Sequence, residues 1–327
     1  MAAAPVEGPL VTVANYCRNC NFGDQLGPVV VKAALERVRE ASELLKVVVI
    51  NLSSADGEAA LATTTSPVVF ACGSLLHRLP SCSAAPAARV LLWGCGCYGD
   101  TETEAARAAA GAATKRAQSV RALRECSPTV LAVRGPLTQE VLAEALGTQH
   151  GAAVVLGDPA ILLPLFYVPP TVPQHPCACP KQEELIVVVP HANDADALAE
   201  AMAASELGTA DRRVTVLASC GQPWQETAAA LASATVVVSS ALHPLVVADA
   251  YRRPVVWLHD KRLPSARTEA RFKFNDWLLG TGRAADQFAL SLDEALVRWR
   301  ELAIEQVTEV ALASQQEALL AALGGAL

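Results

Sequence analysis

Short apolar runs alternate with helical patterns along almost the whole chain, and this alternation limits the fold more than any other feature. The apolar runs are rich in Val, Ile and Leu, as in strands buried on both faces of a parallel sheet. Strands are expected at residues 11–14, 47–51, 68–72, 90–93, 130–133, 153–156, 185–189, 213–218, 236–238 and 254–258. Helical spacing at residues 28–45, 101–124, 136–146, 195–204, 224–234 and in most of 292–323 predicts βαβ units in an α/β protein.

A proline-rich stretch divides this alternation into two halves. Residues 168–180 contain five prolines and no periodicity, which is typical of a linker. We therefore expect an N-terminal Rossmann-like domain over residues 1–167, a linker over 168–184, a second Rossmann-like domain over 185–290 and C-terminal helices over 291–327. Doubly wound parallel sheets bind ligands at the carboxyl ends of their strands, so functional residues should line a cleft between the domains.

Composition excludes several classes of protein. A hydrophobic content of 52% in 327 residues excludes a disordered chain and allows two large cores. No apolar run reaches the roughly 18–20 residues that cross a bilayer, and no secretory signal is visible. The net charge of −7 argues against a broad nucleic-acid surface. The sequence predicts a soluble, cytoplasmic protein without nucleic-acid partners.

The chain has ten cysteines, and their spacing gives little support to a metal site. Cys17 and Cys20 have the two-residue separation of a structural zinc pair, whereas the pairs at 95/97 and 177/179 are one residue too tight. Other cysteines lie in or beside apolar runs and resemble small core residues. We expect reduced thiols and no bound metal.

Residues 235–253 contain the first candidate binding site. Ser239 and Ser240 end a buried strand, and Pro244 suits the first turn of a helix because its missing N–H has no partner there. His243 is therefore expected at a strand-to-helix turn, beside backbone N–H groups that attract anions. A buried histidine that caps a core helix would give the same pattern.

Other predicted strands are followed by polar or glycine-containing groups in the same way. These groups are Asn21, Gly23 and Asp24, then Gly73 and Ser74, Trp93 and Gly94, Arg134, Asp158 and His191. Each is weak evidence alone, because a glycine after a strand is usually a turn and an arginine is usually solvated. At equivalent positions of successive strands, they predict a cleft of cations and N–H donors suited to a small polyanion.

Eight short motifs also occur in the order typical of one known family. They are Asn21-Phe-Gly-Asp24, Gly73-Ser74, Trp93-Gly94, Val133-Arg-Gly-Pro-Leu-Thr138, Gly157-Asp-Pro-Ala-Ile-Leu-Leu-Pro164, Pro190-His191, Ser239-Ser-Ala-Leu-His243 and Lys273-Phe-Asn-Asp276. From about residue 15 to residue 283, the chain resembles the polysaccharide pyruvyl transferase family. The resemblance implies two Rossmann-like domains in a glycosyltransferase-B-like arrangement. It also implies transfer of pyruvate from phosphoenolpyruvate onto a sugar as a ketal.

The resemblance implies roles for individual residues. Arg134 and His243 correspond to the family's donor-site Arg and His, and Lys273 lies in a matching Lys-Phe-x-Asp segment. His243 is the candidate for phosphate contact and proton transfer, and Asp24 is the candidate base on the acceptor side. No cofactor is implied, since phosphoenolpyruvate is a co-substrate. The expected acceptor is a sugar or a lipid-linked oligosaccharide, which would bring the protein to a membrane surface.

Two positions depart from the family pattern and keep alternatives open. Many members have Arg where this chain has Ala241, and Gly where it has Pro244. Arg252, Arg253 or Lys261 would have to replace the missing charge. Two other hypotheses therefore stand: a glycosyltransferase that uses a nucleotide sugar, and a catalytically silent paralogue that binds a glycan.

Overall fold

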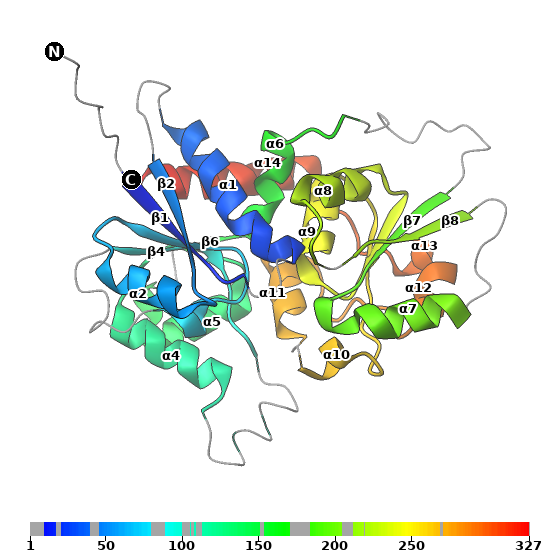
Figure 1. The fold of residues 1–327 in the computed structure, drawn as a ribbon, viewed down its shortest axis with the longest axis horizontal. Coiled ribbons are helices and arrows are strands. Elements are labelled where there is room, and N and C mark those ends of the chain that lie inside the picture. Colours follow the sequence, from blue (N-terminus) through cyan, green and yellow to red (C-terminus); the bar gives the residue numbers. More distant parts are fainter. Residues whose placement is uncertain are drawn as a thin grey trace.

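The computed structural model describes residues 10–17, 21–39, 46–79, 89–99, 105, 108, 113–150, 154–170, 184–204, 212–218, 220–268 and 271–326. These residues form two parallel sheets with helices on both faces, which confirms the expected fold class (Figure 1). Most of the expected linker, residues 171–183, and the cysteines at 177 and 179 lie outside the described residues.

The first sheet has six strands, all paired in parallel. In space they run β2 (Lys46–Asn51), β1 (Leu10–Asn15), β3 (Val68–Ala71), β4 (Val90–Cys95), β5 (Thr129–Val133) and β6 (Val155–Leu156). The helices of this half are α1 (Phe22–Val38), α2 (Ala55–Thr63), α4 (Lys115–Cys126), α5 (Pro136–Leu146) and α6 (Leu163–Phe166), with 3-10 turns η1 (Leu76–Arg78), η2 (Thr148–His150) and η3 (Pro159–Leu162).

The second sheet repeats the same winding with four parallel strands. Its order is β10 (Val255–Trp257), β9 (Val236–Ser239), β7 (Glu184–Val189) and β8 (Arg212–Val216). The helices are α7 (Ala195–Ala204), α8 (Trp224–Ser233), α9 (Leu242–Ala250), α10 (Pro264–Thr268), α11 (Phe272–Gly280), α12 (Leu292–Val297), α13 (Trp299–Leu302) and α14 (Glu309–Gly324), with the turn η4 (Ala192–Asp194).

Both sheets therefore have a point where the winding changes direction, between β1 and β3 in the first and between β7 and β9 in the second. Loops that leave such a pair of strands diverge to opposite faces of the sheet and open a crevice at their carboxyl ends. The two halves thus each present one ligand-binding crevice, and the residues that follow these four strands are the ones to inspect.

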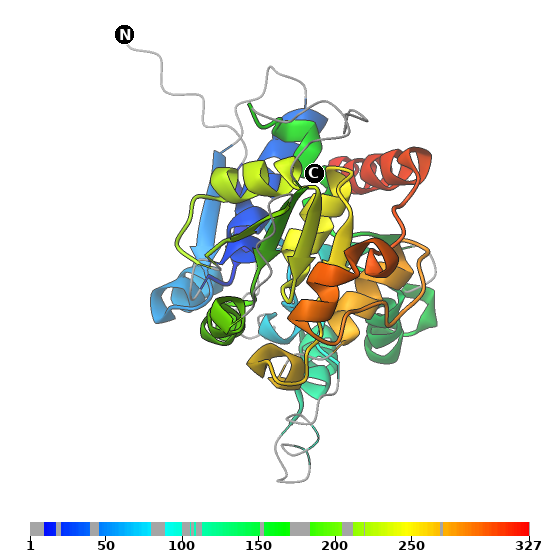
Figure 2. The ribbon, with the colours of Figure 1, turned by 90° about the vertical axis from the view of Figure 1, so that its right-hand side faces the viewer.

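Alternating strand residues bury both faces of each sheet. In β3, Val69 and Ala71 face a core that includes α1, whereas Val68 and Phe70 face the core that includes α4 and α5. The core beneath α1 continues without a break into the second half, where it takes in residues of α8 and α9. Helices α8 and α12–α13 lie on opposite faces of the second sheet (Figure 2). One continuous apolar core therefore joins the two halves.

Helix α14 returns to the first half and packs on its core with Leu319 and Leu323 (Figure 1). Its polar side chains seal this contact, because Gln316 donates to the carbonyl of Ile161 at 2.7 Å and Gln315 to that of Leu156 at 2.8 Å. The chain end thus ties the two sheets together. No helix in the described parts of the chain has the length and hydropathy that crossing a bilayer requires.

Two helices begin earlier than expected, and both lie at the crevices. Helix α1 begins at Phe22 rather than at Pro28, and the side chain of Asn21 accepts from the Asp24 N–H as its N-cap. Pro28 leaves the carbonyl of Asp24 without its helical donor, and Asn15 Nδ2 donates to that carbonyl at 2.8 Å instead. This replacement lets the proline sit inside the helix.

Helix α9 begins at Leu242, so His243 lies in its first turn and not before it. Pro244 still occupies a first-turn position, where a missing N–H costs no helical hydrogen bond. The expected helix at 101–124 is α4, which begins at Lys115. The residues directly before Ala113, apart from two isolated helical positions, lie outside the described part of the chain.

Candidate active site

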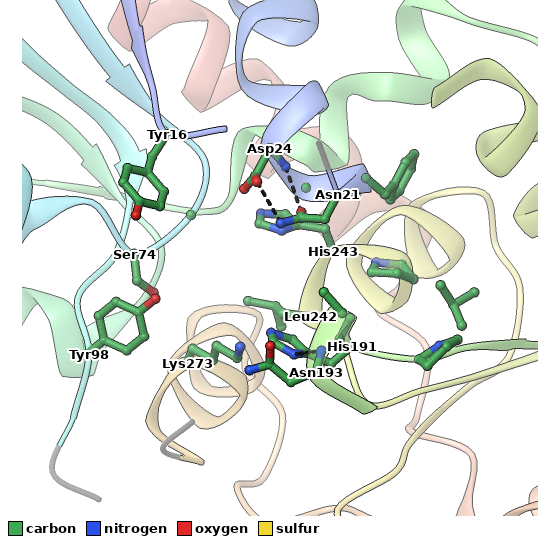
Figure 3. A pocket seen from close by; sticks show the side chains of 18 of the residues that line it. Tyr16, Asn21, Asp24, Ser74, Tyr98, His191, Asn193, Leu242, His243 and Lys273 are labelled. Carbon is green, nitrogen blue, oxygen red and sulfur yellow. Dashed lines mark hydrogen bonds between the residues drawn. The ribbon is translucent and has the colours of Figure 1, made fainter. Parts of the chain in front are cut away.

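A cavity of about 350 Å³ lies between the two halves, where their crevices face each other (Figure 3). The first half contributes residues that follow β1, β3, β4 and β5, and the second half contributes residues that follow β7 and β9 together with one from α11. The side chains used below are Tyr16, Asn21, Asp24, Ser74, Tyr98, Arg134, His191, Asn193, His243 and Lys273. The cavity thus unites residues from both topological switch points.

Asp24 is the carboxylate at the first crevice. Asn21 Nδ2 donates to its Oδ2 at 2.7 Å, and the two residues form a closed cap at the start of α1. Burial raises the pKa of Asp24 to about 6, although the charge of His243 and the hydrogen bonds from Asn21 act in the opposite direction. Near neutral pH this carboxylate can therefore take up and release a proton.

His243 crosses from the second half and packs against the backbone of α1. A side-chain carbon on Gly23 would overlap the imidazole, with its nearest approach at Nδ1. The glycine therefore lets the ring sit directly beside the cap that holds Asp24. The other ring nitrogen, Nε2, lies 3.6 Å from Asp158 Oδ2, which is within ion-pair range but too long for a hydrogen bond.

Asp158 stands behind His243 and does not line the cavity. Its Oδ1 accepts from the N–H of Ala160 at 3.0 Å, whereas Oδ2 and His243 Nε2 are buried without a hydrogen-bond partner among the described residues. Burial alone would raise the pKa of Asp158, but His243, the Ala160 N–H and Arg134 together hold it below its ordinary value. The buried carboxylate of Asp158 is thus ionised and places a negative charge beside the imidazole of His243.

Arg134 has far more partners. Its Nε donates to Asp276 Oδ2 at 3.2 Å, Nη1 to Ser74 Oγ at 3.3 Å and Nη2 to the carbonyl of Cys97 at 3.2 Å. Asp276 also accepts from the N–H and hydroxyl of Thr138 at 3.0 and 2.6 Å. Arg134 belongs to the first half and Asp276 to α11, so this pair locks the two halves beside the cavity.

Ser239 and Ser240 shape the second crevice from beneath. Ser239 Oγ donates to the carbonyl of Val189 at 2.6 Å, and Ser240 Oγ accepts from the His191 N–H at 2.9 Å. Ser240 Oγ also donates to the buried Asp194 at 2.7 Å. The two serines therefore position the loop of His191, and neither lines the cavity.

Trp93 and Gly94, the other predicted site residues, lie away from the cavity. Trp93 is fully buried, and its indole N–H donates to the carbonyl of Leu319 at 2.9 Å. Gly94 has a φ of +73°, and a side chain there would collide with Pro159. These residues pack the first half together, whereas the sequence pattern suggested that this glycine-rich turn approaches a ligand.

The remaining predicted residues, Asn21, Gly23, Gly73, Ser74, His191 and Lys273, all line the cavity. Tyr16, Tyr98 and Asn193 line it too and were not predicted. Tyr16 directly follows β1, and the other two lie three or four residues beyond a strand end, so a wider window after each strand would include them. Asp276 belongs to a motif that was recognised, but its pairing with Arg134 has no local signal.

Three cations were proposed to replace the family's Arg at position 241, and none of them lines the cavity. Ala241 lines the cavity, but Arg252, Arg253 and Lys261 do not. Arg252 donates to the carbonyl of Val307 instead. Asp249, an acid of α9, pairs with Arg283 at 3.0 Å and is also absent from the cavity lining. Within the described residues, no group of three or more His, Cys, Asp and Glu is placed to hold a metal ion.

Comparisons with curated proteins and solved structures give only distant likenesses. No curated protein matches the chain significantly. Among solved structures, the wall teichoic acid polymerase TagF is 9% identical, with a TM-score of 0.45 over 98% of this chain and 89% of that chain. The E. coli heptosyltransferase WaaC with ADP-2-deoxy-2-fluoro heptose is 15% identical, with a TM-score of 0.35 over 77% and 89%. Both likenesses are too distant to support an argument about activity.

The sequence itself carries the family assignment. The model of the family described as polysaccharide pyruvyl transferase matches residues 21–259. This range begins at the cap that holds Asp24 and includes Arg134, Asp158 and His243. The chain therefore belongs to the polysaccharide pyruvyl transferase family.

Proposed function

We propose that the protein transfers the pyruvyl group of phosphoenolpyruvate onto two hydroxyls of a sugar, forming a ketal in glycan biosynthesis. Family membership supports a transferase of glycan biosynthesis. The observation that carries the finer proposal is the meeting of Asp24 and His243 in one cavity that also holds Arg134 and Lys273. A proton-transfer pair beside two cations matches what a phosphorylated enol requires.

The donor occupies the part of the cavity lined by Arg134, His191 and Lys273. Phosphoenolpyruvate carries a carboxylate and a phosphate, and both favour planar or multiple N–H donors. A guanidinium has five N–H groups, and Arg134 uses three of them for Asp276, Ser74 and Cys97. The remaining two N–H groups and the Lys273 ammonium bind the anionic donor.

The reaction balances without an oxidant or a cofactor. A proton adds to C3 of phosphoenolpyruvate, and the electron pair of the double bond forms the new C–H bond. The positive centre left at C2 is attacked by one sugar hydroxyl, which gives up its proton as the C–O bond forms. The bond from C2 to the phosphate oxygen then breaks, and phosphate leaves with the electron pair. A second hydroxyl attacks C2 and closes the ketal, and its proton goes to the departing phosphate.

Two residues carry the protons in this scheme. Asp24, whose pKa is about 6, accepts the proton of the attacking hydroxyl. His243 contacts the phosphate and transfers a proton on the donor side, while the carboxylate of Asp158 lies 3.6 Å behind its Nε2. Asp158 is therefore a positioning residue behind the imidazole.

The test is phosphate release from phosphoenolpyruvate by purified protein in the presence of candidate sugar acceptors. The product should have the mass of the acceptor plus pyruvate less one water, and it should return pyruvate in mild acid. A parallel reaction with nucleotide sugars covers the glycosyltransferase hypothesis. Acceptor binding without phosphate release from either donor class would favour a silent glycan-binding paralogue and refute the proposal.

A further inference from the structure

We propose that Gln25 is a positioning residue, which holds the first turn of α1 against His243 and thereby sets the geometry of Asp24. The consequence for catalysis rests on the proposed function, since Asp24 and His243 are its proton-transfer pair. Helix α1 belongs to the first half and contacts α8 and α9 of the second half (Figure 1). The first turn, which carries Asp24, lies within this contact.

Gln25 makes a two-point contact with residues 220–224, the loop of the second half that leads into α8. Its Nε2 donates to the carbonyl of Gln222 at 2.9 Å, and its Oε1 accepts from the N–H of Trp224 at 3.1 Å. Trp224 is the first residue of α8, and the N-cap Pro223 makes no side-chain bond to this helix. The first N–H groups of a helix have no partner within it. Gln25 therefore caps a helix of the other half.

The N-cap residue of α1 adds a second tie to the same loop. Asn21 pairs with Cys220 as an isolated antiparallel bridge. Asn21 also accepts from the Asp24 N–H and donates to the Asp24 carboxylate. The 220–224 loop thus contacts both ends of the turn between Asn21 and Gln25, and Asp24 lies inside that turn.

His243 contacts the opposite face of this turn. Gly23 is two positions before Gln25 and so lies about 200° around the helix from it. A side chain on Gly23 would overlap the His243 ring, which is drawn beside the cap of Asn21 and Asp24 in Figure 3. The second half therefore holds the first turn from two sides. The 220–224 loop does not line the cavity, so it acts on the site through α1.

Without the Gln25 contact, the turn is free to move away from His243. Asp24 then loses burial, which raises its pKa to about 6, and also the charge of His243, which acts in the opposite direction. Burial is the larger influence, so the pKa should move back toward 3.8. The other basic side chains among the described residues that line the cavity, or the smaller space of about 190 Å³ beside Asp24, are His77, Arg78, Lys115, Arg134, His191 and Lys273. They are the same in every variant compared below.

Melting curves of the full chain without substrate test this inference. The difference in melting temperature between a protein and its Asp24→Asn variant, followed from pH 4 to pH 7, reports the shifted pKa of Asp24. This pH-dependent change should fall to about half or less in Gln25→Met, which keeps the size of the side chain but has no amide. Gln225→Met is the matched control, because it replaces an exposed glutamine next to the loop. It should leave the change as in the wild type.

A second measurement tests the contact on the other face. Gly23→Ala presses a methyl group against the His243 ring and should lower the melting temperature of the wild type. In Gln25→Met the turn can yield, so the same substitution should cost about half as much or less, because residues that share a contact do not act additively. In Gln225→Met it should cost as much as in the wild type.

An unchanged Asp24-dependent profile in Gln25→Met would overturn the inference, and so would an equal cost of Gly23→Ala in the wild type and in Gln25→Met. If the proposed function alone is wrong, phosphoenolpyruvate will release no phosphate, yet both effects on melting will remain.

Discussion

Two buried pairs of a basic and an acidic side chain stand beside the same cavity, and they are satisfied to opposite degrees. Arg134 donates a hydrogen bond to Asp276, and the two residues have further hydrogen-bond partners in Ser74, Cys97 and Thr138. His243 and Asp158 face each other at 3.6 Å, and the two facing atoms have no hydrogen-bond partner in the described parts of the chain.

The two pairs differ in how many of their polar atoms already have a partner within the fold. A buried polar atom normally finds a partner, because leaving it unpaired costs about 1–3 kcal/mol. The Arg134 pair obeys this rule and joins the halves of the molecule. The His243 pair breaks it behind the wall of the cavity, where His243 Nε2 and Asp158 Oδ2 stay 3.6 Å apart without another partner among the described residues. Unsatisfied polar atoms of this kind are typical of functional sites.

Breaking the satisfied pair should have the largest effect on stability. Arg134→Ala leaves the fully buried Asp276 without its counter-charge, and such a loss costs about 3–5 kcal/mol. Urea unfolding should show this as a lower midpoint. The double variant Arg134→Met with Asp276→Asn removes both charges, keeps an acceptor for Thr138 and should recover most of the loss. A single variant as stable as the wild type would contradict this view of the pair.

Changing the unsatisfied pair should affect turnover instead. His243→Gln removes proton transfer, which contributes typically 10²–10⁴-fold, while His243 Nε2 has no hydrogen bond to lose. We expect turnover to fall by about that factor, donor affinity to change much less and the melting temperature to stay close to that of the wild type. Turnover, affinity and melting are measured on one preparation. Unchanged turnover per folded molecule would remove His243 from the mechanism.

Moving the imidazole without removing it sharpens the same contrast. Gly23→Ala places a methyl group against the His243 ring, and a displacement of about 1 Å can cost up to roughly a hundredfold in rate. Gly325→Ala is the matched control, since the nearest atom to its new methyl is 3.4 Å away. Initial rates should fall in the first variant only. Equal rates in both variants would show that the ring position is not critical.

The smallest expected effect is the pH dependence that Asp24 brings. Burial raises its pKa from 3.8 to about 6, so the folded state binds the proton more tightly than the unfolded state. Its contribution to stability should be complete below about pH 4 and disappear as the pH rises through 6, while activity should rise over the same interval. Melting curves and rates between pH 4 and 7 test this. A slope that survives in Asp24→Asn would have another origin.

Much of the fold could be predicted from local pattern. All ten expected strands overlap a strand of the structure. These strands and the helix at Pro136–Leu146 depend on features within a few residues, such as β-branched runs, a first-turn proline and a terminal glycine. The predicted start of α1 was wrong for an equally local reason. Pro28 suggested a helix beginning, whereas the Asn21 cap, three residues before Asp24, was the better signal.

The candidate site was only partly predictable, because residues after a strand can serve packing as well as binding. Ser74 and His191 line the cavity, while Trp93 and Gly94 follow the same pattern and pack against α14 and Pro159. No spacing distinguishes the two outcomes. Which strand ends face the other half depends on the position of each strand in its sheet.

The sequence by itself thus determined the α/β class, the family and about half of the described residues that line the cavity. Only the tertiary structure decided that the two switch points face each other, that Asp276 neutralises Arg134 and that Asp158 stands behind His243. These pairs join residues 142 and 85 positions apart, and their contact depends on how the halves dock through a shared apolar core. Such docking buries non-directional apolar surface, so no local pattern in the chain specifies which polar groups it brings together.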